Sequence, residues 1–199
     1  MRLAPPVPHA PRILRTARLT LLPPGLENLA DLVRLKADPR VFGLMLHGVR
    51  TPERTREELE DDIEFWEVRG YGTWCVFRDG TAERGDGDFL GICGFMERPD
   101  GRGVALRYAL WPEERGRGYA REAAQAALDF GHAAGLRRII AVAWAENLAS
   151  RLVLQEIGMR ECDEFLHQGR RMLVHESLAG AGPPPAPALP RGGNAGGAE

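Results

Sequence analysis

The segment Glu114–Glu122, ERGRGYARE, places two glycines and two arginines directly before a predicted helix. The first amide groups of a helix have no partners within the helix, and the helix dipole adds partial positive charge there. Gly116 and Gly118 leave the backbone bare, so that the oxygens of a phosphate can approach several amides at once. Arg115 and Arg117 add charged donors. The segment therefore predicts a pyrophosphate-binding turn, and the alternative is an ordinary loop-to-helix joint with solvated arginines.

Two other phosphate-binding loops do not fit this segment. A P-loop requires lysine and then serine or threonine after its second glycine, and ERGRGYARE contains none of these. A dinucleotide-binding fingerprint requires a third glycine, where this chain has Arg121. The dinucleotide-binding fingerprint also follows a strand of a βαβ unit, whereas the strand before this turn belongs to a predicted meander.

The elements around the turn follow from hydrophobic periodicity and from the positions of Gly and Pro. Strands are predicted at Thr16–Pro24, Thr73–Arg78, Asp88–Glu97, Gly103–Trp111, Arg137–Trp144, Met159–Leu166 and Arg170–Glu176. Helices are predicted at Gly25–Ala37, with Asp38-Pro39 as its stop, at Thr51–Gly70, at Tyr119–Ala134 and at Ala149–Ile157. We expect an α/β fold of the mixed α+β kind, with a single mixed, mostly antiparallel sheet of about six to seven strands flanked by about four helices.

Composition limits the classes of partner. The chain has 199 residues, 27% of them charged, and a formal net charge of -2, which does not suggest a nucleic-acid partner. No apolar run approaches the roughly 20 residues that span a membrane, and the Pro-rich N-terminus lacks the apolar centre of a signal peptide. The three cysteines are scattered, so we expect reduced thiols in a cytoplasmic protein, without a metal site.

The two ends of the chain differ from its middle. Residues 1–15 contain four prolines and predict an irregular arm, and residues 16–177 predict one folded domain. Residues 178–199 are rich in Pro, Gly and Ala, and have too few large apolar groups to become ordered, so we expect a disordered tail.

The chain resembles the GNAT superfamily of acetyl-CoA-dependent N-acetyltransferases, and its RimJ/RimL-type branch in particular. Arg115–Ala120, RGRGYA, matches the family's motif Arg/Gln-x-x-Gly-x-Gly/Ala. The stretch RYALWPEE is similar to the family's preceding strand and turn, and AENLAS followed by LVLQEIGM is similar to its N-x-x-S helix. TARLTLLPP is similar to the opening strand of the branch. The resemblance runs from about Thr16 to Glu176 and implies the GNAT fold with acetyl-CoA as co-substrate.

The resemblance also implies which residues hold acetyl-CoA. The pyrophosphate would lie on the turn formed by Arg115, Gly116, Arg117, Gly118, Tyr119 and Ala120. The pantetheine arm would pair with the backbone of Tyr108, Ala109, Leu110 and Trp111, on a strand that splays away from its neighbour. An amide of Ala109 or Leu110 would polarise the thioester carbonyl. Asn147 matches a CoA-contacting asparagine, and its alternative or additional role is a helix N-cap.

Catalytic candidates are fewer. Ser150 matches the serine that in this branch lies near the sulfur and donates a hydrogen bond to the departing thiolate, and its alternative is an ordinary first-turn serine. Relatives often carry a glutamate on the strand that corresponds to Val104–Arg107, where this chain has no carboxylate. Glu97 on the preceding strand is the substitute general base, with Asp163 and Glu164 as alternatives.

Two further residues stay open. A cysteine nucleophile would be Cys93, and His47 lies where the family's substrate loop runs. Both are weaker candidates than Ser150, because a histidine or cysteine at such a position is more often a packing residue.

The predicted function is acetyl-CoA-dependent N-acetyl transfer to a primary amine, by direct attack within a ternary complex. The amine would belong to a protein N-terminus or a small molecule. A homodimer through the sheet edge or the final hairpin is a further expectation from the family. The alternative is a non-catalytic acyl-CoA-binding protein of the same fold, which the missing strand glutamate favours.

Overall fold

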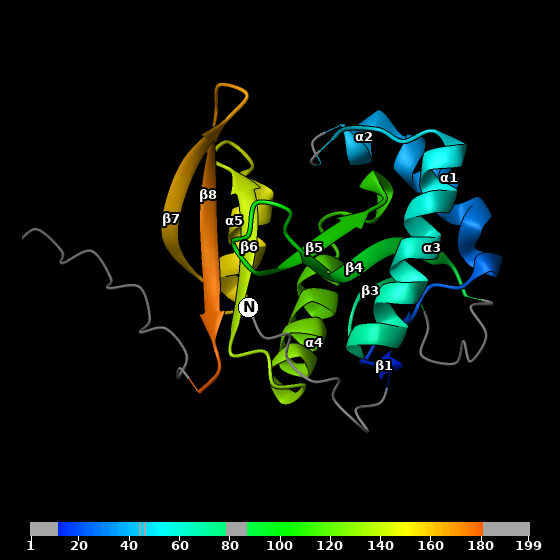
Figure 1. The fold of residues 1–199 in the computed structure, drawn as a ribbon, viewed down its shortest axis with the longest axis horizontal. Coiled ribbons are helices and arrows are strands. Elements are labelled where there is room, and N and C mark those ends of the chain that lie inside the picture. The colour runs from blue at the N-terminus through cyan, green and yellow to red at the C-terminus, as the bar shows by residue number, and fades with distance from the viewer. Residues whose placement is uncertain (1–11, 44, 46, 79–86, 181–199) are drawn as a thin grey trace, which may run out of the picture.

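One mixed sheet runs through the part of the chain that the computed structural model describes, residues 12–43, 45, 47–78 and 87–180 (Figure 1). Its strands lie in the order β1-β2-β3-β4-β5-β6-β8-β7. They are β1 (Leu14–Arg15), β2 (Leu19–Leu22), β3 (Thr73–Arg78), β4 (Phe89–Glu97), β5 (Val104–Leu110), β6 (Arg138–Trp144), β7 (Arg160–His167) and β8 (Arg170–Leu178). The α-helices are α1 (Leu29–Ala37), α2 (Pro39–Phe42), α3 (Pro52–Arg69), α4 (Tyr119–Ala133) and α5 (Leu148–Glu156). Neighbouring strands are antiparallel except β5 and β6, which are parallel.

The predicted fold class is confirmed, and the strand count is corrected. The described residues form eight strands rather than six to seven, because Leu14–Arg15 pairs with β2 inside the segment predicted as an irregular arm. A two-residue strand has no periodicity by which a sequence could reveal it. Leu178 is the last residue of β8 and pairs with Arg138, so the tail does not begin there. The rest of the predicted arm (1–11) and tail (181–199) lies outside the described residues.

The helix count is also corrected, from about four to five in the described residues. The Asp38-Pro39 pair was expected only to stop the preceding helix. Asp38 instead begins α2, since its side chain accepts a hydrogen bond from the Arg40 amide at 2.8 Å, and Pro39 occupies the first helical position. The same residue types that end one helix are also good N-caps and first-turn residues, so the sequence could not decide between the two roles.

The helices cover the two faces of the sheet. Helices α1, α2 and α3 bury Leu35, Phe42 and Leu59 against one face, in a cluster with Ile92 and Ala109. Helices α4 and α5 cover the opposite face and belong to a second, larger cluster, which includes Ala123, Ala127, Leu128, Leu154, Ile157, Leu106 and Leu110. Among the described residues, no helix is both long and apolar enough to cross a membrane.

Helix α4 lies so close to the sheet that one helical position requires glycine. A Cβ atom added at Gly131 would lie 2.7 Å from both the Phe95 ring and the Ile139 side chain. Replacing an interior helical glycine by alanine normally adds up to about 1 kcal/mol of stability, but overpacking costs about 1–3 kcal/mol. We therefore expect Gly131→Ala to lower the free energy of unfolding in urea by about 1–2 kcal/mol.

The exposed change Asp129→Ala in the same helix is the control for that prediction, with an expected change within about 0.5 kcal/mol. A Gly131→Ala variant that is more stable than the parent protein would show that helix propensity, rather than close packing, decides at this position.

The parallel pair β5–β6 separates almost as soon as it forms. Within these two described strands the register has one partner pair, Ala105 with Ile140, near the start of β5. Figure 1 shows β5 running towards α2 while β6 stays beside β8 and α5. The carboxyl half of β5 therefore has one edge against β4 and the other open towards the gap, as the resemblance implied.

Candidate functional site

The glycine-rich turn lies at the N-terminus of α4 and is exposed. Gly116 and Gly118 have φ values of 74° and 79°, in the left-handed region that favours glycine. Gly118 is the N-cap residue and has no side chain with which to cap the first amides of the 15-residue helix. These amides, together with the dipole of α4, can attract an anion, which is the chemistry expected of this turn from the sequence.

A residue that the sequence did not suggest, Arg18, holds this turn in place. Its guanidinium donates to the carbonyl oxygen of Arg117 at 2.8 Å and lies 4.7 Å from the centre of the Tyr119 ring. In a planar trans peptide the carbonyl and the following N–H point in opposite directions. By binding the Arg117 carbonyl, Arg18 therefore directs the N–H of Gly118 away from itself.

Glu122 in turn fixes Arg18. The Arg18 Nε donates to Glu122 Oε2 at 2.7 Å, and the Thr16 hydroxyl donates to Glu122 Oε1 at 2.6 Å. Burial alone would raise the pKa of Glu122, but the hydrogen bonds from Thr16 and Arg18 outweigh it, and the net shift is downward. The sequence could not indicate the contact between Arg18 and the Arg117 carbonyl, because the two residues are 99 positions apart.

The open edge of β5 presents the backbone of alternate residues. The Trp111 amide donates to Leu90 on the β4 side at 2.9 Å, and Arg98 donates to the Gly103 carbonyl at 3.0 Å. In an antiparallel ladder every second residue bonds to the same neighbour. The odd-numbered residues of β5, Ala109 among them, therefore bond towards β4, and the backbones of Tyr108 and Leu110 face the gap. Of the two amides expected near a thioester, only that of Leu110 lies on the open side.

Ser150 and Tyr108 meet across this gap. The Tyr108 phenol donates to the Ser150 carbonyl at 3.1 Å and lies 2.9 Å from the Ser150 hydroxyl, where either oxygen can be the donor. Burial raises the pKa of Tyr108 to about 12, so the phenol keeps its proton at neutral pH. Tyr108 was expected to act through its backbone alone, because nothing in the sequence brought its side chain to α5.

Asn147 has the structural role that was considered for it. It is the N-cap of α5, and its side-chain oxygen accepts a hydrogen bond from the Ser150 amide at 3.1 Å. This bond fixes the first turn of α5 and with it the position of the Ser150 hydroxyl.

The structure does not bring Glu97 to this place. Glu97 lies at the end of β4, 45% exposed, in an ion pair of 2.8 Å with Arg69. It is opposite Val104, four residues before Tyr108 on β5. Four residues of strand measure about 13 Å. Its ion pair and this separation favour a structural role over that of a general base at Ser150.

The alternative carboxylates lie elsewhere too. Asp163 is 2.8 Å from Arg102, and Glu164 accepts from Arg171 Nε at 2.7 Å. Both are on β7, the outermost strand on that side of the sheet. Cys93 is fully buried, and its burial raises the pKa of the thiol, which disfavours a thiolate nucleophile.

The segment of β5 in which relatives often carry a glutamate, Val104–Arg107, has an arginine instead, and its side chain is held by hydrogen bonds. The Arg107 guanidinium donates to the Thr73 hydroxyl at 2.9 Å and to Asp62 of α3 at 3.3 Å. This part of β5 therefore carries an ion pair with Asp62 rather than an unpaired carboxylate. The described residues contain no group of three or more His, Cys, Asp or Glu side chains that could hold a metal ion.

Comparisons with known proteins bear on this arrangement. The family model described as acetyltransferase (GNAT) domain matches residues 18–160. A curated relative, the FsC-acetyl coenzyme A-N(2)-transacetylase of Aspergillus fumigatus, is 26% identical over 170 residues, which are 78% of this chain and 68% of the relative.

Solved structures share the fold. An acetyltransferase from Agrobacterium tumefaciens superposes with a TM-score of 0.71 at 24% identity, covering 85% of this chain and 95% of the other. RimL, a ribosomal L7/L12 alpha-N-protein acetyltransferase in complex with coenzyme A, superposes with a TM-score of 0.67 at 16% identity, covering 83% and 97%.

Proposed function

Because the chain belongs to the GNAT family of acetyltransferases, we propose that it binds acetyl-CoA between the Gly116–Ala120 turn and the open edge of β5. As a family member it is an N-acetyltransferase that uses acetyl-CoA and an amine acceptor. The observation that carries the proposed site is the juxtaposition of three features: the exposed glycine turn of α4, the free edge of β5 and the Ser150–Tyr108 pair.

Each part of the cofactor has a counterpart in this site. The pyrophosphate is held by amides at the start of α4, with Arg115 and Arg117 as exposed charged donors. The pantetheine arm pairs with the backbone of β5 between Tyr108 and Trp111, in place of the missing partner strand. Asn147 contributes through α5, whose first turn it caps.

The transfer needs little beyond orientation. The neutral amine attacks the thioester carbon, and the carbonyl electrons move onto oxygen, where the Leu110 amide stabilises the negative charge. Collapse of the intermediate breaks the carbon–sulfur bond and releases the CoA thiolate. The thiolate takes a proton from the Ser150 hydroxyl, Tyr108 passes its own proton to Ser150 through their hydrogen bond, and water then reprotonates Tyr108. The amine gives up its extra proton to water, so the site needs no carboxylate base.

The first experiment titrates the purified protein with acetyl-CoA by calorimetry. The liganded protein is then offered a panel of primary amines and N-terminal peptides, and free CoA thiol is measured. Binding followed by amine-dependent thiol release supports the enzyme. Binding without thiol release for any amine favours the non-catalytic acyl-CoA-binding alternative, and absence of binding overturns the proposed site.

Arg18 gives a second prediction, because it holds the Arg117 carbonyl and with it the turn. We expect Arg18→Ala to raise the Kd for acetyl-CoA about tenfold, since the Gly118 amide loses its fixed direction. Affinity for acetyl-pantetheine, which lacks the pyrophosphate, should stay unchanged. Arg18→Lys, which keeps one donor for the Arg117 carbonyl, should lose less.

The control for Arg18 is Arg12→Ala, which removes another N-terminal ion pair, with Glu67. Equal losses for acetyl-CoA and acetyl-pantetheine in Arg18→Ala would indicate general loosening of the fold and would contradict the positioning role.

Further proposals concern the setting of the enzyme. The catalytic unit extends from β1 to the end of β8, a range that encloses the residues matched by the family model. We place it in the cytoplasm, because the similar RimL is an acetyltransferase of a ribosomal protein. A homodimer through the edge strand β7 or the β7–β8 hairpin is checked by light scattering at micromolar concentration.

A further inference from the structure

Two hydrogen-bonded contacts join α2 to the turn between β5 and α4. The Arg115 guanidinium donates a hydrogen bond to the backbone carbonyl of Arg40 at 3.0 Å, although the two residues are 75 positions apart. In the opposite direction, the Arg40 guanidinium lies 2.8 Å from the Glu113 carboxylate. Because this turn is the one proposed to hold the pyrophosphate of acetyl-CoA, α2 is joined directly to the proposed cofactor site.

The carbonyl of Arg40 is a favourable place for a cationic donor. The last four carbonyls of a helix have no partners within the helix, and the helix dipole gives that end partial negative charge. Helix α2 has only four residues, Pro39–Phe42, so Arg40 belongs to this set. The charge of Arg115 also contributes to the lowered pKa of the N-cap residue Asp38, of which the hydrogen bond from Arg40 is the main cause. Arg115 therefore stabilises a helix that is too short to be stable by itself.

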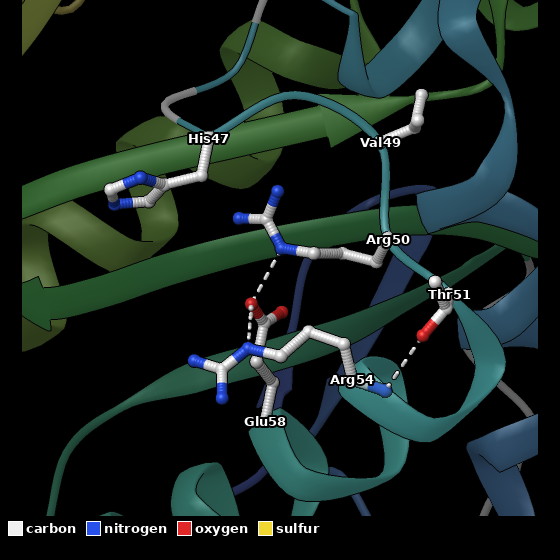
Figure 2. A pocket seen from close by; sticks show the side chains of 6 residues that line it. All are labelled: His47, Val49, Arg50, Thr51, Arg54 and Glu58. Atoms are coloured by element: carbon white, nitrogen blue, oxygen red, sulfur yellow. Dashed lines mark hydrogen bonds and ion pairs between the residues drawn. The ribbon is translucent and has the colours of Figure 1, made fainter.

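Helix α2 also contacts β5, the other part of the proposed cofactor site. Its side chains Val41 and Phe42 are buried in the same cluster as Ala109 of β5. The loop that leads from α2 into α3 presents His47 and Val49 to a pocket of about 380 Å³ (Figure 2). A shift of α2 would therefore move both the side chains that pack beside β5 and the start of this loop.

The geometry of a guanidinium allows Arg115 to hold α2 and a phosphate at the same time. Its five N–H donors lie in one rigid plane, and the bond to the Arg40 carbonyl uses only the Nη2 group. The side chain is exposed and directly precedes Gly116, the first glycine of the turn. An exposed arginine loses rotamer freedom when it is fixed, which weakens its bond to Arg40 in the free protein. A phosphate on the other edge of the guanidinium would already fix the side chain, so the bond to α2 would become stronger.

We propose that Arg115 is a positioning residue that couples cofactor binding to α2, because the pyrophosphate fixes its guanidinium and the guanidinium then holds the Arg40 carbonyl more firmly. The inference rests on the proposed pyrophosphate site at Gly116–Ala120. By thermodynamic linkage the coupling acts in both directions, so an ordered α2 also favours cofactor binding. Arg117 has a different role, since its side chain pairs with Glu114 of the same turn at 3.5 Å and, in the described part of the chain, forms no bond to α2.

The test is hydrogen–deuterium exchange of the full chain with and without saturating CoA, with binding measured in parallel by calorimetry. The amides of Val41, Phe42 and Gly43 donate to carbonyls at the start of α2, so their exchange reports the opening of this helix. We expect CoA to slow the exchange of these three amides about fivefold, which corresponds to about 1 kcal/mol.

Variants at the two arginines of the turn separate positioning from charge. Arg115→Gln should abolish the slowing of exchange in α2, even at saturating CoA. Arg115→Lys keeps the charge beside the pyrophosphate and should bind CoA more tightly than Arg115→Gln, but an ammonium group lacks the two-edged fork, so the slowing should again be lost. Arg117→Gln, an equal loss of charge in the same turn, is the control: it should weaken CoA binding and keep the slowing once CoA is saturating.

The outcomes distinguish this inference from the proposed function. Binding of CoA with unchanged or faster exchange in α2 would overturn the coupling and leave the proposed function intact. Equal slowing in Arg115→Gln and in the parent protein would also overturn it. Absence of CoA binding in the calorimeter would contradict the proposed cofactor site itself, and the coupling with it.

Discussion

The variant Gly118→Glu is expected to lose more than a hundredfold in affinity for acetyl-CoA, measured by calorimetry. The new carboxylate would stand at the N-terminus of α4, on the site proposed for the pyrophosphate. There it interacts favourably with the helix dipole and with Arg18, whose NH2 group is 3.3 Å from the position of the new Cβ. The protein should therefore stay folded, while the new carboxylate occupies the anion site and repels the pyrophosphate of acetyl-CoA.

Charge and strain contribute separately to this expected loss. A hundredfold loss corresponds to about 2.7 kcal/mol, which repulsion between one carboxylate and a pyrophosphate a few ångströms away readily exceeds. The left-handed φ of Gly118 costs a non-glycine residue only about 1 kcal/mol. Gly118→Ala, which carries strain without charge, should consequently lose no more than about tenfold.

A matched control is available in the same protein. Gly101 has a φ of 73° and open space around the position of its Cβ, in the turn between β4 and β5. Gly101→Glu therefore introduces the same charge and the same backbone strain away from α4, and its acetyl-CoA affinity should match that of the parent protein. Normal binding by Gly118→Glu would remove the α4 turn from the cofactor site.

The second large effect is expected for Ser150→Ala, which should lower kcat about hundredfold with little change in the Kd for acetyl-CoA. The hydroxyl is assigned to proton delivery to the departing thiolate, and loss of a positioned general acid typically costs about 10²–10⁴-fold. The control is Ser177→Ala, which should leave kcat unchanged. Ser177 is on β8, which β6 separates from β5, and its hydroxyl forms a hydrogen bond with His132.

Tyr108→Phe distinguishes the two hydroxyls of the pair. If Ser150 delivers the proton and Tyr108 supports it, Tyr108→Phe should lower kcat less than Ser150→Ala does, and the double variant should resemble Ser150→Ala. A larger loss in Tyr108→Phe would make the phenol the acid. Unchanged turnover in Ser150→Ala would take the serine out of the mechanism.

The pH–rate profile provides an independent readout of this pair. The pKa of Tyr108 is raised from about 10 to about 12 by burial. The phenol therefore stays protonated through the neutral and moderately alkaline range, and kcat should have no falling limb from Tyr108 below about pH 11. The same shift affects the free energy of unfolding. Because the pKa of Tyr108 is higher in the folded state, its contribution to stability is fully present below pH 10 and is lost progressively as the pH rises towards 12.

Much of the fold could be predicted because its signals are local. Thr51 and Pro52 predicted the start of α3. The helix begins at Pro52, and the Thr51 side chain accepts a hydrogen bond from the Arg54 amide. Gln168-Gly169 marks the hairpin turn between β7 and β8, and both residues have positive φ. The order and spacing of the GNAT motifs indicated the family, which the match of the family model to residues 18–160 confirms.

The sequence by itself determined the elements other than β1 and α2, the glycine turn and the N-cap of α5, because each depends on residues within one or two helical turns of each other. Only the tertiary structure decided the contacts between distant segments. It brought Arg18 to the carbonyl of Arg117 and paired Tyr108 with Ser150. It also placed Glu97 in an ion pair with Arg69, away from Tyr108 and Ser150. It also chose between Ala109 and Leu110, since strand register decides which amides face the gap and no local pattern encodes it.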